Sequence, residues 1–205
     1  MRLDKSFYEK SALELAKDLL GKVLVHEING ESLKGIIVET EAYIGAIDKA
    51  SHAYGGKITP SIEALYKKPG TIYVYSVYGM YTCFNIIAGK EGEAEGVLIR
   101  AIEPIKGINT MSLRRFNFLF NNLNKTQKRS ITNGPAKLCI AMGIDKSYNC
   151  ASVIKNDTLY VEENPNYEFN YEVVEAKRVG IDYAEEAVDF LWRFYIKDNF
   201  YVSKK

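Results

Sequence analysis

Residues that hold metals or disulfides are scarce in this 205-residue chain. There are three cysteines, Cys83, Cys139 and Cys150, with no Cys-x-x-Cys pair, and two histidines, His26 and His52, on separate segments. An odd number of scattered cysteines argues against a disulfide framework, and neither residue type shows metal-ligand spacing. We therefore expect reduced thiols and no metal site.

Long apolar runs are also nearly absent. The first ten residues carry charges throughout and lack the apolar core of a signal peptide, from which we expect a cytoplasmic protein. One uncharged stretch, Pro69 to Gly89, is long enough to span a bilayer as a helix. Its four tyrosines, its polar residues and its central Gly79 instead predict a buried β-hairpin, so no membrane contact is expected.

Neither sign of charge dominates the whole chain. A net charge of +1, with 47% hydrophobic and 26% charged residues, has the balance of one globular domain over residues 1–205. Residues 106–146, however, hold eight basic side chains, Lys137 among them, against one acidic side chain. This segment suits the phosphates of a nucleic acid, and a solvated basic face without a partner is an equal alternative.

Local patterns predict a first helix and a mostly antiparallel, meandering sheet. Ser11-Ala-Leu-Glu14 forms a capping box ahead of an apolar stripe that stops at Gly21. Asn29-Gly30 supplies a turn near two strands, and Gly79 supplies a hairpin. Strands are expected at residues 22–28, 35–43, 97–101, 158–161 and 171–179, and helices over 105–146 with a mobile loop at 121–130.

The segment Ile37-Val-Glu-Thr-Glu-Ala-Tyr-Ile-Gly45 combines acids with an aromatic ring. On a strand, Glu39, Glu41 and Tyr43 share one face, and a second aromatic run, Tyr73 to Tyr81, has the same period of two. The two runs suggest a pocket that grips a flat ring beside an acid or base. Spacing alone leaves Glu39 and Glu41 equal candidates, and surface carboxylates with core tyrosines remain the alternative interpretation.

Several strings, in order along nearly the whole chain, resemble the alkyladenine DNA glycosylases, also called 3-methyladenine or N-methylpurine DNA glycosylases. They are Leu13-Glu-Leu-Ala-Lys-Asp-Leu-Leu-Gly-Lys-Val-Leu-Val25, Val38-Glu-Thr-Glu-Ala-Tyr43, Lys68-Pro-Gly-Thr-Ile-Tyr-Val-Tyr75, Tyr78-Gly-Met-Tyr81, Leu98-Ile-Arg-Ala-Ile-Glu-Pro104, Thr132-Asn-Gly-Pro-Ala-Lys-Leu-Cys139, Arg178-Val-Gly-Ile181 and Arg193-Phe-Tyr195. The resemblance implies a single α+β domain with a curved, mostly antiparallel sheet and surrounding helices.

The resemblance also implies a function. A monofunctional enzyme of base excision repair would flip alkylated purines out of double-stranded DNA and hydrolyse the N-glycosidic bond, leaving an abasic site. It would work as a nucleoid-associated monomer without metal or cofactor. The expected substrates are 3-methyladenine and 7-methylguanine; hypoxanthine and ethenoadenine would also need a general acid, which the sequence does not identify.

Site residues carry over from the resemblance position by position. The reaction would use the base Glu41, with Arg100 and the main-chain carbonyl of Val179 positioning the water. The base pocket would consist of Tyr43, His52, Tyr75 and Asn85, with Asn85 crowding out the guanine amine. Contact with DNA would come from Tyr78 as a wedge, from Met80 and Tyr81 beside it, and from Lys137.

Two other functions remain open from the sequence. A non-catalytic module could keep the aromatic surface and bind damaged DNA without releasing bases. A nucleoside N-glycosidase could use the same carboxylate and aromatic walls, but would not need Tyr78 or the basic segment.

Overall fold

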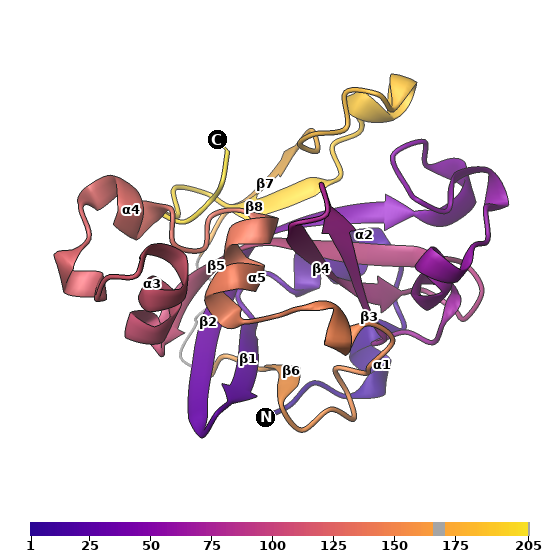
Figure 1. Cartoon of the computed structure of the whole chain (residues 1–205). Helices are drawn as coiled ribbons and strands as arrows, with labels where there is room; N and C mark the ends of the chain where they lie inside the picture. The colour runs from indigo at the N-terminus through magenta and orange to yellow at the C-terminus, as the bar shows by residue number, and fades with distance from the viewer. Residues whose placement is uncertain (166–170, 205) are drawn as a thin grey trace.

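One long, bent strand organises the sheet. The computed structural model describes residues 1–165 and 171–204, in which β2 (Glu31–Ile44) pairs with β1 (Val23–Ile28) through its first half and with β8 (Arg193–Ile196) at residues 39–41. Its opposite edge pairs with β5 (Glu95–Lys106), with register shifts on either side of Glu39. Such irregularities bend a strand and increase its twist. The bend lets β2 follow the curl of the whole sheet (Figure 1).

The remaining strands extend the sheet on both sides of β2. The order is β3 (Ile72–Val77), β4 (Tyr81–Ala88), β5, β2, β1 and β6 (Leu159–Glu162), while β7 (Val173–Ala176) pairs with β8. All of these pairings are antiparallel. The expected α+β class with a curved, mostly antiparallel sheet is confirmed.

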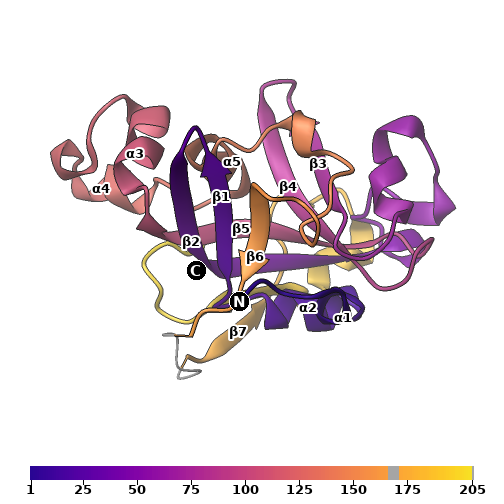
Figure 2. The same ribbon diagram turned by 90° about the horizontal axis from the view of Figure 1, so that it is seen from below.

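Helices cover both faces of this sheet. α1 (Lys5–Tyr8) and α2 (Ala12–Asp18) lie on one face, and α5 (Pro135–Met142) lies on the other (Figures 1 and 2). α3 (Ile108–Phe116) and α4 (Lys125–Arg129) form an arm beside α5. Short 3₁₀ helices complete the described elements: η1 (Gly45–Ile47), η2 (Tyr54–Gly56), η3 (Pro60–Tyr66), η4 (Phe120–Asn122), η5 (Lys146–Tyr148) and η6 (Glu185–Asp189).

Local sequence signals account for several boundaries. Ser11 and Glu14 form both hydrogen bonds of the capping box, and α2 buries Ala12, Leu15 and Ala16. Asn29 and Gly30 both have positive φ, 53° and 77°, as a two-residue hairpin turn of this hand requires. The helix that this capping box begins and this turn are both confirmed, although a short helix that was not predicted, α1, precedes α2.

Two expectations need correction. Residues 121–130 are not simply a loop, because Asn124 and Gln127 form a capping box that starts α4. The pattern Asn-x-x-Gln was visible in the sequence, but the crowding of polar residues around it suggested a loop. β2 and β5 also extend well beyond residues 35–43 and 97–101, because each gains pairing partners along its full length.

The uncharged stretch from Pro69 to Gly89 forms the β3–β4 hairpin, as expected. Across the described parts of the chain, no helix is both long enough and apolar enough to cross a bilayer.

Candidate active site

β2 brings two carboxylates into the interior of the protein. Glu39 and Glu41 are both fully buried, and both accept hydrogen bonds from Arg100 on β5. Thr40, between them, points to the opposite face, where its hydroxyl donates to the carbonyl of Ala16 in α2. The expected shared face of the two acids is therefore confirmed, whereas the alternative that they are surface carboxylates is wrong.

Glu39 accepts four hydrogen bonds, one more than Glu41. Its Oε1 accepts from Arg100 Nε at 3.2 Å, Arg193 Nη1 at 3.0 Å and the Ser203 hydroxyl at 2.9 Å. Its Oε2 accepts from the Ser203 amide at 2.7 Å. A carboxylate with these donors holds β2, β5, β8 and the C-terminal segment together, which is a structural role.

Glu41 is less completely occupied. Its Oε2 accepts from the Tyr43 hydroxyl at 2.8 Å and from Arg100 Nη1 at 3.2 Å, whereas Oε1 accepts only from the Val179 amide at 2.7 Å. A carboxylate oxygen has two lone pairs, so Oε1 retains one acceptor position. Glu39 Oε2 also accepts a single hydrogen bond, so the open position alone does not separate the two acids. They differ in where their donors lie, because Tyr43, Arg100 and Val179 line a cavity, whereas Arg193 and Ser203 do not.

Arg100 is held as a cation between these acids. Burial alone lowers the pKa of its guanidinium, but the neighbouring Glu41 and Glu39 carboxylates outweigh burial and raise it. The pKa of Tyr43 is also raised, but here burial and the charge of Glu41 act in the same direction. Burial, followed by the negative charge of Glu41, raises the pKa of its hydroxyl, so this group stays protonated and donates to the carboxylate.

All three donors to Glu41 line one cavity of about 310 Å³, at the small end of the usual range for small-molecule sites. The cavity brings together most of the residues singled out from the sequence: Tyr43, His52, Tyr75, Tyr78, Asn85, Arg100 and Val179. Glu41 itself lies directly behind this lining and is closed off from bulk water.

One wall of the cavity is an aromatic cluster. The Tyr75 ring stacks on Tyr73 with centroids 5.3 Å apart, and His52 meets Tyr75 edge to face at 4.6 Å. His52 Nδ1 lies 2.8 Å from the Tyr73 hydroxyl. Partial desolvation, and then the positive charge of Lys57, lower the pKa of His52 below its ordinary value of 6.5, so the ring is neutral at pH 7. Tyr73 was not expected in this cluster, although it belongs to the aromatic run.

Asn85 has a fixed orientation at the cavity wall. Its Nδ2 donates to the Tyr73 carbonyl at 3.1 Å and more weakly to the Cys83 carbonyl at 3.5 Å. Both acceptors are main-chain groups of the β3–β4 hairpin, so the carboxamide cannot swing aside without losing them. The side chain is thus a rigid part of the wall.

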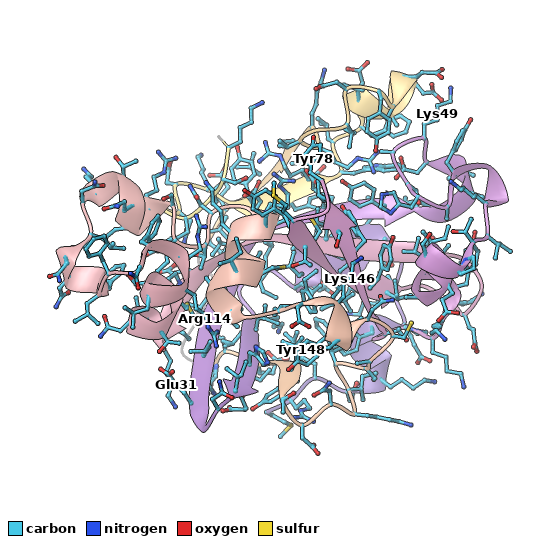
Figure 3. All side chains as sticks on the ribbon, viewed as in Figure 1. Glu31, Lys49, Tyr78, Arg114, Lys146 and Tyr148 are labelled. Atoms are coloured by element: carbon cyan, nitrogen blue, oxygen red, sulfur yellow. The ribbon has the colours of Figure 1, made fainter. Side chains whose placement is uncertain are left out.

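The β3–β4 hairpin carries the exposed tip. Tyr78 and Gly79 have φ of 53° and 70°, and Met80 N–H donates to the Val77 carbonyl, which closes a tight turn. The side chains of Tyr78, Met80 and Tyr81 are 87%, 76% and 41% exposed. A bulky residue with positive φ costs about 1–2 kcal/mol, and three exposed apolar side chains together indicate a contact surface. Figure 3 shows Tyr78 at the upper end of the hairpin.

Part of the basic segment gathers beside α5. Arg115 donates to the carbonyls of Ile131 and Ser130, and Lys137 Nζ donates to Asn133 Oδ1. Desolvation, and then the charges of Arg115 and Arg129, lower the pKa of Lys137. Across residues 1–165 and 171–204, none of these three cations pairs with a carboxylate. We call Arg115, Arg129 and Lys137 the cationic triad.

Two features of the site were missed in the sequence. Arg178 is fully buried, binds both oxygens of the equally buried Asp48 at 2.6 and 2.8 Å, and lies 4.7 Å from the centroid of the Tyr43 ring. Arg178 thereby connects the loop after β2 with the segment that contains Val179.

The second missed feature concerns Val179. Its amide, rather than its carbonyl, contacts Glu41. The string Arg178-Val-Gly-Ile181 marked this region, but no spacing rule links it to Asp48.

Known proteins resemble this chain along nearly its whole length. The model of a family described as "Methylpurine-DNA glycosylase (MPG)" matches residues 6–200. Curated proteins from Clostridium tetani (61% identical), Clostridium botulinum strain Langeland (60%) and Clostridium perfringens strain SM101 (58%) each bear the name "Putative 3-methyladenine DNA glycosylase". Each of these alignments covers 100% of both chains.

Proposed function

Since this chain belongs to the methylpurine-DNA glycosylase family and is a DNA glycosylase, we propose that it removes alkylated purines from double-stranded DNA with a water activated by Glu41. The expected bases are 3-methyladenine and 7-methylguanine. The observation that carries the proposal is the single remaining acceptor position on Glu41 Oε1, directly behind a cavity lined by all three of its donors. Residues 1–205 would act as one domain and as a monomer.

Glu41 accepts the proton in this reaction. The bond between the sugar C1′ and the purine nitrogen breaks, and its electron pair leaves with the purine. Water then forms the new bond to C1′ and passes a proton to Glu41 Oε1. A cationic alkylpurine leaves as a neutral base, so this step needs no general acid.

Arg100 and Val179 set the geometry of the base. Arg100 holds Glu41 Oε2, and the Val179 amide holds Oε1, so the carboxylate cannot rotate freely. The remaining acceptor direction on Oε1 is therefore defined before substrate binds. The Val179 carbonyl, which the family resemblance connects with the water, belongs to the same short main-chain segment.

Selection of alkylated purines comes from the aromatic walls. Tyr43, Tyr75 and neutral His52 present electron-rich rings, which bind a cationic purine more strongly than a neutral one by about 0.5–2 kcal/mol per contact. Asn85, held by two main-chain carbonyls, forms a rigid edge that would crowd the exocyclic amine of guanine.

DNA binding uses the exposed tip and the cationic triad. Tyr78, with Met80 and Tyr81 beside it, would fill the gap that a flipped nucleotide leaves in the duplex. Lys137 and its two neighbouring arginines would contact backbone phosphates. The phosphates would then be the anionic partners that these three cations do not have among the described residues of the protein.

The function is tested by incubating the protein with methylated duplex DNA and measuring the free 3-methyladenine and 7-methylguanine by chromatography. Methylated deoxynucleosides serve as the second substrate. We expect release from duplex and little from nucleosides. Tight binding of the duplex without release would identify a binding module, and equal release from nucleosides with weak salt dependence would identify a nucleosidase.

The triad gives a separate prediction. Lys137→Ala should weaken binding to all duplexes alike and reduce the slope of log Kobs against log salt concentration by about 1, because one phosphate contact is lost. Titration of a fluorescent duplex at several salt concentrations measures this slope. Lys5→Ala is the matched control, since Lys5 is an exposed lysine in α1, on the opposite face of the sheet from α5. Equal slopes for wild type and Lys137→Ala would remove Lys137 from the DNA contacts.

A further inference from the structure

Tyr183 lines the cavity together with Tyr43, Val179 and Ile181, but its side chain is 67% exposed. The ring therefore stands at the rim of the cavity, whereas Tyr43 and Tyr75 form its interior walls. A large aromatic side chain left in solvent at the mouth of a pocket contributes little to folding. Such a ring is available for a ligand that fills the pocket and extends out of it.

The segment that carries Tyr183 is firmly attached. Ile181, Ala184 and Ala187 are buried in a small cluster with Ala50, against which Tyr43 packs. Lys49 forms ion pairs with Glu185 and Glu186, at 2.6 and 2.8 Å, across the two loops. Figure 3 shows Lys49 next to the segment of η6, on the same upper side of the molecule as Tyr78. Tyr183 is thus presented from a fixed position.

Its hydroxyl is only weakly engaged. The Tyr183 hydroxyl donates to the Ala50 carbonyl at 3.4 Å, which is long for an O–H···O hydrogen bond. Replacing this weak hydrogen bond with one to a better acceptor would therefore cost little free energy. Partial desolvation raises the pKa of this hydroxyl; the positive charge of Arg178 opposes the shift, and the negative charges of Asp48 and Glu41 add to it, so the hydroxyl remains a donor.

Tyr183 stands at the Glu41 end of the cavity, four residues beyond Val179, whose amide binds Glu41. On the proposed function, on which this inference rests, C1′ of the flipped nucleotide lies next to Glu41 and the purine lies among Tyr43, His52 and Tyr75. The deoxyribose and its phosphates must then pass the rim. We propose that Tyr183 binds the sugar-phosphate of the flipped nucleotide, with its ring against the deoxyribose and its hydroxyl donating to an adjoining phosphate.

A duplex that contains a pyrrolidine abasic nucleotide tests this contact, because the probe keeps a cationic sugar and both phosphates but has no base. We expect Tyr183→Ala to bind this duplex about tenfold more weakly than wild type, from loss of the ring contact, and Tyr183→Phe about threefold more weakly, from loss of one hydrogen bond. Binding to the same duplex without the abasic analogue should be unchanged. Phe200→Ala, which removes a partly exposed ring outside the cavity lining, should bind both duplexes like wild type.

The outcomes separate this inference from the proposed function. Equal affinity of wild type and both Tyr183 variants for the abasic duplex would overturn the inference, even if wild type releases methylated bases. Equal weakening on both duplexes would also overturn it, because the contact would then be to ordinary duplex. Failure of wild type to release any base would instead overturn the proposed function. Tyr183→Phe retains the ring packing, so it keeps the test valid if Tyr183→Ala folds poorly.

Discussion

Glu41→Gln is expected to lower the single-turnover rate of 7-methylguanine release from methylated duplex by about 10²–10⁴-fold, the usual contribution of a general base. The amide has nearly the same shape as the carboxylate and can still accept from the Val179 amide, but it cannot take a proton from water. The rate is measured by chromatography of the released base with enzyme in excess over DNA.

Glu39→Gln is the matched control for this prediction. Glu39 lies two residues away on β2, is equally buried and also binds Arg100. Loss of its charge leaves Arg100 and Arg193 short of a partner, so a large loss of stability is expected, in the range of about 3–5 kcal/mol for a broken buried ion pair. Its rate, measured at a temperature where circular dichroism shows it folded, should stay within about tenfold of wild type, well short of the loss of a general base. If Glu39→Gln loses as much activity as Glu41→Gln, the assignment of the base to Glu41 fails.

Tyr78→Asn is expected to separate stability from activity. Asn-Gly is the preferred pair for a turn with two positive φ values, so replacing Tyr78 should leave the fold intact or stabilise it by about 1 kcal/mol. Excision from duplex should fall by about 10–100-fold, because nothing then fills the gap left by the flipped nucleotide. Urea denaturation measures the first effect, and single-turnover excision measures the second.

Excision from single-stranded DNA is the control for the Tyr78→Asn variant. In single-stranded DNA the damaged nucleotide has no partner strand and is less firmly stacked, so a wedge contributes less. The ratio of duplex to single-strand excision should therefore fall in Tyr78→Asn. An equal decrease on both substrates would show that Tyr78 serves the pocket rather than the duplex, and a decrease in stability would show that the tip is structural.

Expectations from the sequence were most accurate where the responsible interactions are local. The capping box of Ser11 and Glu14 and the turn at Asn29-Gly30 depend on residues at most three positions apart, and both are present as expected. The antiparallel pairing of β1 with β2 follows from the same turn. α4 was missed even though Asn124 and Gln127 form a local cap, because the polar composition of the segment outweighed that short pattern.

The candidate site was only partly accessible from the sequence. Residues that share a strand or a hairpin, such as Tyr43 with Glu41 and Tyr75 with Asn85, could be assigned to one pocket from the period of two and the family resemblance. Tyr183 and the Asp48–Arg178 pair could not, because nothing in their spacing relates them to β2. These residues reach the site only when the segment that follows β7 folds back against the loop after β2.

The sequence by itself determined the family, the α+β class and the two carboxylates that could serve as a base. Spacing alone did not distinguish between these carboxylates; the family resemblance favoured Glu41, and the tertiary structure adds a physical difference between the two acids. Glu39 is bound by Arg193 and Ser203, which are 154 and 164 residues away along the chain and lie outside the cavity lining, whereas all three donors to Glu41 line the cavity. Strand periodicity gives both acids the same direction, and contacts with distant segments, which form only when the chain is folded, decide which of the two borders the cavity.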